Sequence, residues 1–152
     1  MSSPPSKALL KDQLLRALTA DLAVRERAYR AAREGATHQE VKPENDKDTR
    51  ALEQSYLARG EALRLEDLRT ALAEVQTMPV EDFDGAGPVR LGALVVTDEE
   101  GQAGLLWVAP HGGGTRLLDG AVQVATPKSR LGRAILGANA GDRLQGNASS
   151  TP

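Results

Sequence analysis

Several residue types that mark particular classes of protein are missing or scarce in this chain. It contains no cysteine, which excludes disulfide frameworks and cysteine-ligated zinc sites. Aromatic residues make up only 3% of the 152 residues, too few for a platform that stacks nucleic-acid bases. The formal net charge is -2, so the chain does not coat nucleic acid by charge alone. These absences exclude several classes of function, but they do not indicate which function the protein has.

No apolar run is long enough to span a bilayer, so we expect no membrane contact. The first residues, Met1 to Ser6, lack the basic and apolar regions of a signal peptide, and we expect a cytoplasmic protein. Charged residues make up 26% and hydrophobic residues 40%, as in a folded soluble chain. The length suits one ordinary domain or two small ones.

The first half of the chain has helical periodicity in two long stretches. In residues 6–36, apolar side chains recur at alternating three- and four-residue steps, which indicates one buried stripe. A second helix is expected from Asp46 to Thr77, and Pro79 suits its end. The stripes consist of Leu15, Leu18, Leu22, Tyr29, Ala32 and Ala36 on the first helix, and Ala58, Ala62, Leu65, Leu68, Leu72 and Val75 on the second.

Folding the chain about residue 42 places the two stripes opposite each other, which predicts an antiparallel coiled-coil hairpin over residues 6–78. At its base, Leu10 to Leu22 would face Leu63 to Val75. Toward the tip the facing residues are small. A glycine costs ~1 kcal/mol relative to alanine inside a helix. The expected use of Gly60 is therefore a close approach of the two helices, or a bend.

The pattern changes from helical to β after residues 79–88, which are rich in glycine and acids and are expected to form a linker. The expected strands span 89–97, 104–110 and 121–125, and a short helix at 129–136 ends at Gly137. Residues 1–5 and 145–152 are polar, and we expect disordered tails. Trp107 is expected in the core and His111 on the surface. The fold class is then α+β: a helical hairpin followed by a small antiparallel sheet domain over residues 89–144.

Three carboxylates are concentrated where the two helical stretches meet. Glu44, Asp46 and Asp48 lie beside Pro43, which interrupts the helical pattern. At the end of a hairpin such a group would deliver metal-binding oxygens into a narrow place. A structural interpretation is also open, because Asn45 is a good N-cap and acids in the first turn suit the helix dipole.

The length of the tip depends on where the first helix ends. Thr37 and Glu40 have the spacing of a capping box, and with that box the tip is a longer structured loop beginning at Gly35. We expect the tip within residues 37–48.

Near the C-terminus, the run from Ser129 to Gly137, followed by Gly141 and Asp142, resembles a motif of bacterial Gre factors, a family of transcript-cleavage and transcription elongation factors. The family pattern is Ser-Pro-Leu-Gly-x-Ala-Leu-x-Gly, followed by Gly-Asp. This chain has Ser129, Leu131, Gly132, Ala134, Gly137, Gly141 and Asp142 at the matching positions. In the N-terminal half, Glu44-Asn45 matches the Glu-Asn of the Gre hairpin tip. The resemblance covers roughly residues 6–144.

The resemblance implies an accessory factor, without an active site of its own, that combines a coiled-coil hairpin with an FKBP-like domain. In that family the globular domain docks on RNA polymerase, and the hairpin enters the secondary channel. Tip acids help the polymerase hold a second Mg²⁺ and a water, and the polymerase then hydrolyses its own backtracked transcript. The implied partners are RNA polymerase and, indirectly, the 3′ end of the nascent RNA. We expect a monomer with no stably bound metal and no cofactor of its own, sharing Mg²⁺ with the polymerase.

The resemblance implies roles for particular residues. The implied tip acids are Glu44, Asp46 and Asp48, and the tip structure involves Pro43 and Asn45. The candidate contacts with RNA or the channel wall are Arg30, Arg33 and Arg50. A solvated helix face is the simpler interpretation of the arginines.

Departures from the family pattern leave the direction of the effect open. Glu40 and Val41 stand where the pattern has Gly and Asp, so one of the usual tip acids is missing. Arg130 replaces the proline of the C-terminal motif, and the strands that follow Gly-Asp in the family have little sequence here after Asp142. The protein then either stimulates cleavage weakly or occupies the channel and inhibits. A hypothesis of another class is a helical-hairpin adaptor for a different protein.

Overall fold

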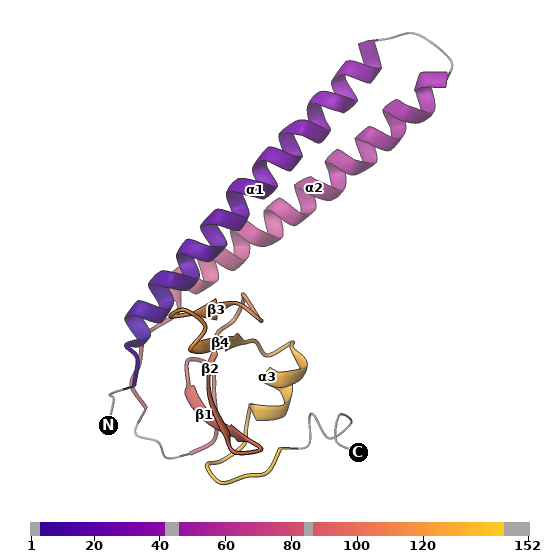
Figure 1. Cartoon of the computed structure of the whole chain (residues 1–152). Coiled ribbons are helices and arrows are strands. Elements are labelled where there is room, and N and C mark those ends of the chain that lie inside the picture. Colours follow the sequence, from indigo (N-terminus) through magenta and orange to yellow (C-terminus); the bar gives the residue numbers. More distant parts are fainter. Residues whose placement is uncertain (1–3, 42–45, 84–86, 145–152) are drawn as a thin grey trace. The chain divides into compact units, whose positions relative to one another are not determined.

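The computed structural model describes residues 4–41, 46–83 and 87–144, without the side chains of 36–51 and 54 (Figure 1). The fold is α+β. Its helices are α1 (Lys7–Val41), α2 (Asp46–Thr77) and α3 (Arg130–Ile135). Its strands are β1 (Leu94–Glu99), β2 (Gln102–Val108), β3 (Arg116–Leu117) and β4 (Val122–Ala125). The chain divides into two compact units: unit 1 contains residues 1–17 and 71–152, and unit 2 contains residues 18–70.

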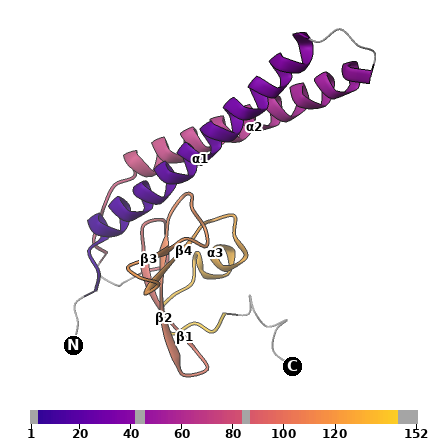
Figure 2. The ribbon, with the colours of Figure 1, turned by 45° about the horizontal axis from the view of Figure 1, so that its top comes forward.

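Unit 2 contains the part of α1 from residue 18 onward and the part of α2 up to residue 70. There the two helices run side by side in opposite directions in both views (Figure 1 and Figure 2). Two ion pairs join them: Arg25 lies 3.9 Å from Glu61, and Arg69 lies 3.7 Å from Glu26. Within this unit, electrostatic contacts therefore join the two helices.

The predicted bounds of the second helix are confirmed to the residue, since α2 spans Asp46–Thr77. The first helix is longer than predicted and continues to Val41. A structured loop beginning at Gly35 is therefore wrong. No proline lies between Lys7 and Val41, and one glycine costs a helix only ~1 kcal/mol, which is too little to end it.

The predicted apolar stripe of α2 is buried at Leu65, whereas Leu63, the first residue of the segment expected to face the first helix, does not face it. The Leu65 residue is only 4% exposed, whereas Leu63 is 63% exposed. At 3.6 residues per turn, positions two apart lie about 160° from each other around the helix. Both leucines cannot face the same neighbour.

Gly60 is not a point of close approach. A Cβ placed on its backbone meets no other atom within 4 Å. The glycine therefore lies on α2 with open space around it, and the predicted tight packing at this position is wrong.

Replacing Gly60 with alanine is expected to stabilise the protein by about 0.5–1 kcal/mol, because alanine loses less backbone entropy and fits the open space. Urea denaturation followed by helical circular dichroism measures the change in the free energy of unfolding. The control Ala62→Gly, on the same helix, should lose a similar amount. A destabilised Gly60→Ala protein would contradict the open environment.

Unit 1 is built on a four-stranded sheet with the order β1-β2-β4-β3. Strands β1 and β2 form an antiparallel hairpin, in register from Leu94 opposite Trp107 to Glu99 opposite Gln102. The turn residues Glu100 and Gly101 have φ values of 54° and 84°, as a two-residue hairpin turn requires.

The predicted antiparallel sheet is wrong at its centre, because β2 and β4 pair in parallel and the sheet is mixed. After β2 the chain crosses to β3 at the far edge, and β4 returns between them, antiparallel to β3. The two-residue β3 is too short to leave a sequence pattern. The first strand also begins later than predicted, because Arg90 to Ala93 form a turn in which Gly92 has a φ of 91°.

The core of unit 1 lies between the sheet and α3, which covers one face of it (Figure 1). Leu106, Val108, Ala125 and Ile135 form its buried cluster. Trp107, as predicted, is in the core and is only 1% exposed. In the parts of α1 and α2 that belong to unit 1, the side chains of Leu10, Leu14 and Val75 are also fully buried.

Candidate functional site

The acidic segment predicted as the functional site falls at the junction of α1 and α2. Because α1 ends at Val41 and α2 begins at Asp46, Asp46 and Asp48 occupy the first turn of α2. Acids at this position interact favourably with the positive end of the helix dipole. The predicted tip residues Pro43, Glu44 and Asn45 lie outside the described residues, as do the side chains of Asp46, Asp48 and Arg50.

Among the predicted arginine contacts, Arg30 and Arg33 are exposed on α1. Sequence analysis missed the importance of Glu61. Its side chain is 15% exposed and forms ion pairs with Arg64 at 3.0 Å and with Arg25 at 3.9 Å. Glu61 therefore holds two arginines, one from each helix of unit 2. No sequence signal distinguishes it from the other acids of α2.

The Gre-like C-terminal motif builds the start of α3. The Ser129 hydroxyl accepts a hydrogen bond from the Gly132 backbone N–H at 2.9 Å and donates one to the Thr126 carbonyl at 2.8 Å. Ser129 is thus the N-cap of the helix. Gly132 is required because a Cβ there would overlap the Thr126 carbonyl oxygen.

The rest of the motif is also explained by the fold. Gly137 follows α3 with a φ of 83°, and its N–H donates to the Val89 carbonyl at 2.9 Å. The Asp142 carboxylate accepts from the Asn139 N–H at 2.8 Å, in a turn where Gly141 has a φ of 92°. Leu131 packs on the core cluster, and Ala134 is half-buried. The motif residues thus cap α3 and form the turns that follow it.

Ser129→Ala is expected to destabilise unit 1 by about 1–2 kcal/mol, because the helix loses its N-cap and Thr126 loses its hydroxyl partner. Chemical denaturation followed by tryptophan fluorescence measures the loss. The exposed neighbour Lys128 provides the control, and Lys128→Ala should stay within about 0.5 kcal/mol of wild type. If Ser129→Ala and Lys128→Ala were equally stable, Ser129 would not act as a stabilising N-cap.

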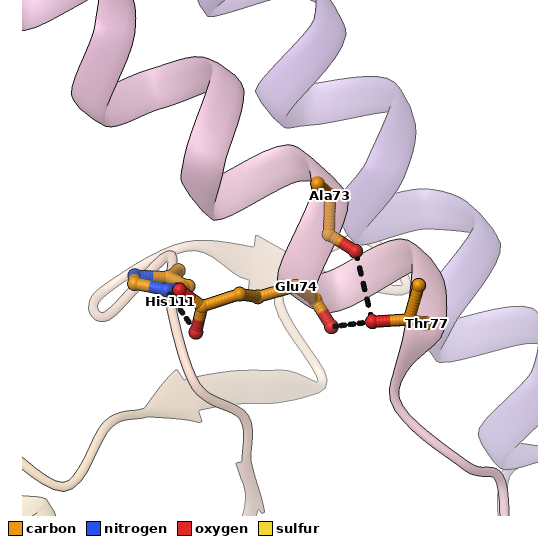
Figure 3. A network of polar contacts seen from close by, with 4 residues as sticks. All are labelled: Ala73, Glu74, Thr77 and His111. Atoms are coloured by element: carbon orange, nitrogen blue, oxygen red, sulfur yellow. Dashed lines mark hydrogen bonds and ion pairs between the residues drawn. The ribbon is translucent and has the colours of Figure 1, made fainter.

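His111 is tied to the end of α2 and is more than a plain surface residue. Its Nε2 lies 3.0 Å from the Glu74 carboxylate (Figure 3). In the same turn the Thr77 hydroxyl donates to the Ala73 carbonyl at 3.0 Å. Next in the chain, a Cβ on Gly112 would press on the Leu14 side chain. The loop after β2 therefore packs on the parts of α1 and α2 that belong to unit 1, and the exposed contact between His111 and Glu74 itself adds under about 1 kcal/mol.

The predicted linker is anchored at its beginning. Lys7 Nζ donates to the Glu81 carbonyl at 2.7 Å and lies 4.1 Å from the centre of the Phe83 ring. Arg90 lies 3.9 Å from the same ring. Burial lowers the pKa of Lys7, and Arg90 acts in the same direction against the attraction of Asp82 and Glu81. Two cations thus hold one aromatic ring between α1 and the sheet domain.

A shallow, open groove in unit 1 runs along the first turns of α1. Its lining includes Leu9, Asp12, Gln13, Arg16, Ala17, Arg116 and Leu117. Gln13 Oε1 accepts from the Leu118 N–H at 2.8 Å, and Arg16 pairs with Asp12 at 3.0 Å. Asp12, Gln13 and Arg16 are thus engaged in contacts within the protein, which does not suit a catalytic site.

Within the part of the chain that the structure describes, no three His, Asp or Glu side chains gather as metal ligands. The predicted tip acids are not covered by that statement. Across the same described residues, no helix has both the length and the apolar character needed to cross a membrane.

Comparison with protein-family models, with curated proteins and with solved structures returned no match. Function must therefore be argued from the chain's own residues.

Proposed function

We propose that this protein is a Gre-like regulator of transcription elongation that binds RNA polymerase through the secondary channel. It modulates the cleavage of backtracked RNA by the polymerase active site and has no active site of its own. The observation that carries the proposal is the position of the acidic segment. Glu44, Asp46 and Asp48 fall where one long helix has ended at Val41 and the next begins.

Two long helices support the mode of entry that we propose. At 1.5 Å per residue, the 32 residues of α2 extend about 48 Å. In unit 2 the two helices run in opposite directions and are joined by ion pairs. We propose that they form a coiled-coil hairpin. Such a pair is slender enough to enter a channel that excludes a globular domain.

The chemistry of the donor set fits Mg²⁺. Magnesium prefers oxygen ligands and is commonly bound through one or two carboxylates together with substrate phosphates. Glu44 would be the first of the three acids to reach the metal, with Asp46 and Asp48 as auxiliaries. A second Mg²⁺ in the polymerase site would activate a water for attack on the RNA phosphodiester. The protein's own contribution is to place carboxylate oxygens there.

We propose that the sheet domain is FKBP-like and docks on the polymerase outside the channel. Its Gre-like motif residues hold α3 and the following turns against the sheet, as described for Ser129, Gly132 and Gly137. In this proposal the protein acts in the cytoplasm and binds polymerase as a monomer. In the same proposal Arg30, Arg33 and Arg50 would contact the RNA or the channel wall.

A cleavage assay on stalled, backtracked elongation complexes tests the proposal. Added protein should change the rate of transcript shortening, and it should compete with an active Gre factor for one site on the polymerase. Val41, at a position where the family has an acid, makes weak stimulation or net inhibition the expected direction. Simultaneous binding of both factors with unchanged cleavage would refute the proposal. Recovery of a different protein in a pull-down, without polymerase subunits, would instead support an adaptor.

A further inference from the structure

A second apolar stripe lies on the exposed side of α2, within unit 2. Leu52, Tyr56 and Leu63 are 52%, 58% and 63% exposed, and Arg59 lies exposed among them. Successive members are four, three and four residues apart, so all four side chains fall within about 60° of one another around the helix.

This stripe points away from the side of α2 that the chain itself buries. Leu65 and Val75 are buried, and they lie more than about 90° around the helix from Leu63 and Tyr56. Isolated exposed leucines are common on protein surfaces, but large apolar side chains gathered on one exposed helix face indicate an interaction surface. The chain supplies no cover for this face among its described residues.

The order of the side chains indicates what covers the stripe. The spacing of four, three and four reads the same in both directions, with its midpoint between Leu57 and Ala58. A second copy of α2, running antiparallel about that midpoint, would place Leu52 opposite the partner's Leu63. The same rotation would place Tyr56 opposite the partner's Arg59.

Both of these contacts are chemically favourable. Leucine against leucine removes apolar surface from water. Within one chain the Arg59 guanidinium already lies 5.7 Å from the centre of the Tyr56 ring, and in the pair it meets a second ring. Each contact occurs twice, because a two-fold interface uses the same patch on both copies.

We propose that the free protein forms a reversible antiparallel dimer through the α2 stripe, defined as Leu52, Tyr56, Arg59 and Leu63. Four side chains per copy make a small interface, so its dissociation constant should lie between about 1 µM and 1 mM. The dimer does not rest on the proposed polymerase function. If that function holds, dimer and polymerase-bound monomer exclude each other, because a second helix pair would block entry into the channel.

Cysteine cross-linking tests the register directly, because the chain has no cysteine of its own. In the proposed dimer Leu52 lies opposite the partner's Leu63, whereas the two copies of Leu52 are about 16 Å apart along the helices. A disulfide requires Cα atoms within about 7 Å. A mixture of Leu52→Cys and Leu63→Cys proteins should therefore form a covalent dimer under mild oxidation. Each variant alone should stay monomeric on a non-reducing gel.

Analytical ultracentrifugation across about 10 µM to 1 mM supplies the equilibrium measurement. Leu63→Glu should weaken association at least about tenfold. Leu57 is the matched control, since it is 56% exposed on the same helix but lies outside the stripe. Leu57→Glu should leave association unchanged. A monomeric wild-type protein at about 1 mM, equal effects of the two glutamates, or cross-linking of either cysteine variant alone would overturn the proposal.

Discussion

Replacing Gly132 with alanine is expected to unfold the sheet domain or to lower its free energy of unfolding by about 3 kcal/mol or more. The added Cβ would overlap the Thr126 carbonyl oxygen, which is backbone and cannot rotate away as a side chain can. That carbonyl also accepts the Ser129 hydroxyl at 2.8 Å and the Ser129 N–H at 3.0 Å. Moving it would break the N-cap of α3, so strain and lost hydrogen bonds add together.

Urea denaturation followed by fluorescence measures this loss, because Trp107 is the chain's single tryptophan and lies buried in the affected unit. Gly60→Ala is the matched control: the substitution is the same and again lies within a helix, but the site is open. The two variants should change stability in opposite directions. A loss below about 1 kcal/mol at Gly132 would show that Thr126 can shift without cost to the core.

Removing the Glu44 carboxylate is expected to slow transcript cleavage roughly tenfold to a hundredfold, if the protein stimulates the polymerase as proposed. Metal sites typically lose activity on this scale when a group that orients the metal's ligands is removed. Binding to polymerase should stay nearly unchanged, because one acid contributes little to the whole contact. The measurement compares single-turnover cleavage of backtracked RNA with wild-type and Glu44→Ala protein at saturating concentration.

Two further variants sharpen this experiment. Glu44→Gln keeps the size of the side chain and removes its charge, and should be as slow as the alanine variant. Glu53, an exposed acid further along α2, provides the control, and Glu53→Ala should cleave at the wild-type rate. Equal cleavage with wild type and Glu44→Ala would remove Glu44 from the mechanism. If the wild type inhibits instead, unchanged inhibition by Glu44→Ala would show that occupancy of the channel suffices.

The candidate site could be predicted only in part. The sequence places Asp46 and Asp48 at the start of the second helix, and α2 does begin at Asp46. Glu61 could not be found, because its role depends on Arg25 arriving from the other helix. The motif around Ser129 was selected by resemblance, and the structure explains its serine and glycines as parts of α3 and its turns. These structural roles of the motif residues do not depend on a binding partner.

What the sequence determined by itself was local. The ends of α2 follow from Pro43 and Pro79, and the short α3 follows from Ser129 and Gly137, because caps and breakers act within one turn. Periodicity also identified a buried side for each long helix. These signals involve residues close together in the sequence, so they can be recognised without the tertiary structure.

Only the tertiary structure decided which strands pair and which glycines matter. The parallel pairing of β2 with β4 depends on a crossover whose outer strand, β3, has just two residues. Gly60 and Gly132 look alike in sequence, yet one borders open space and the other a backbone carbonyl. Strand order and available volume are set by segments distant in the chain, and no local pattern carries that information.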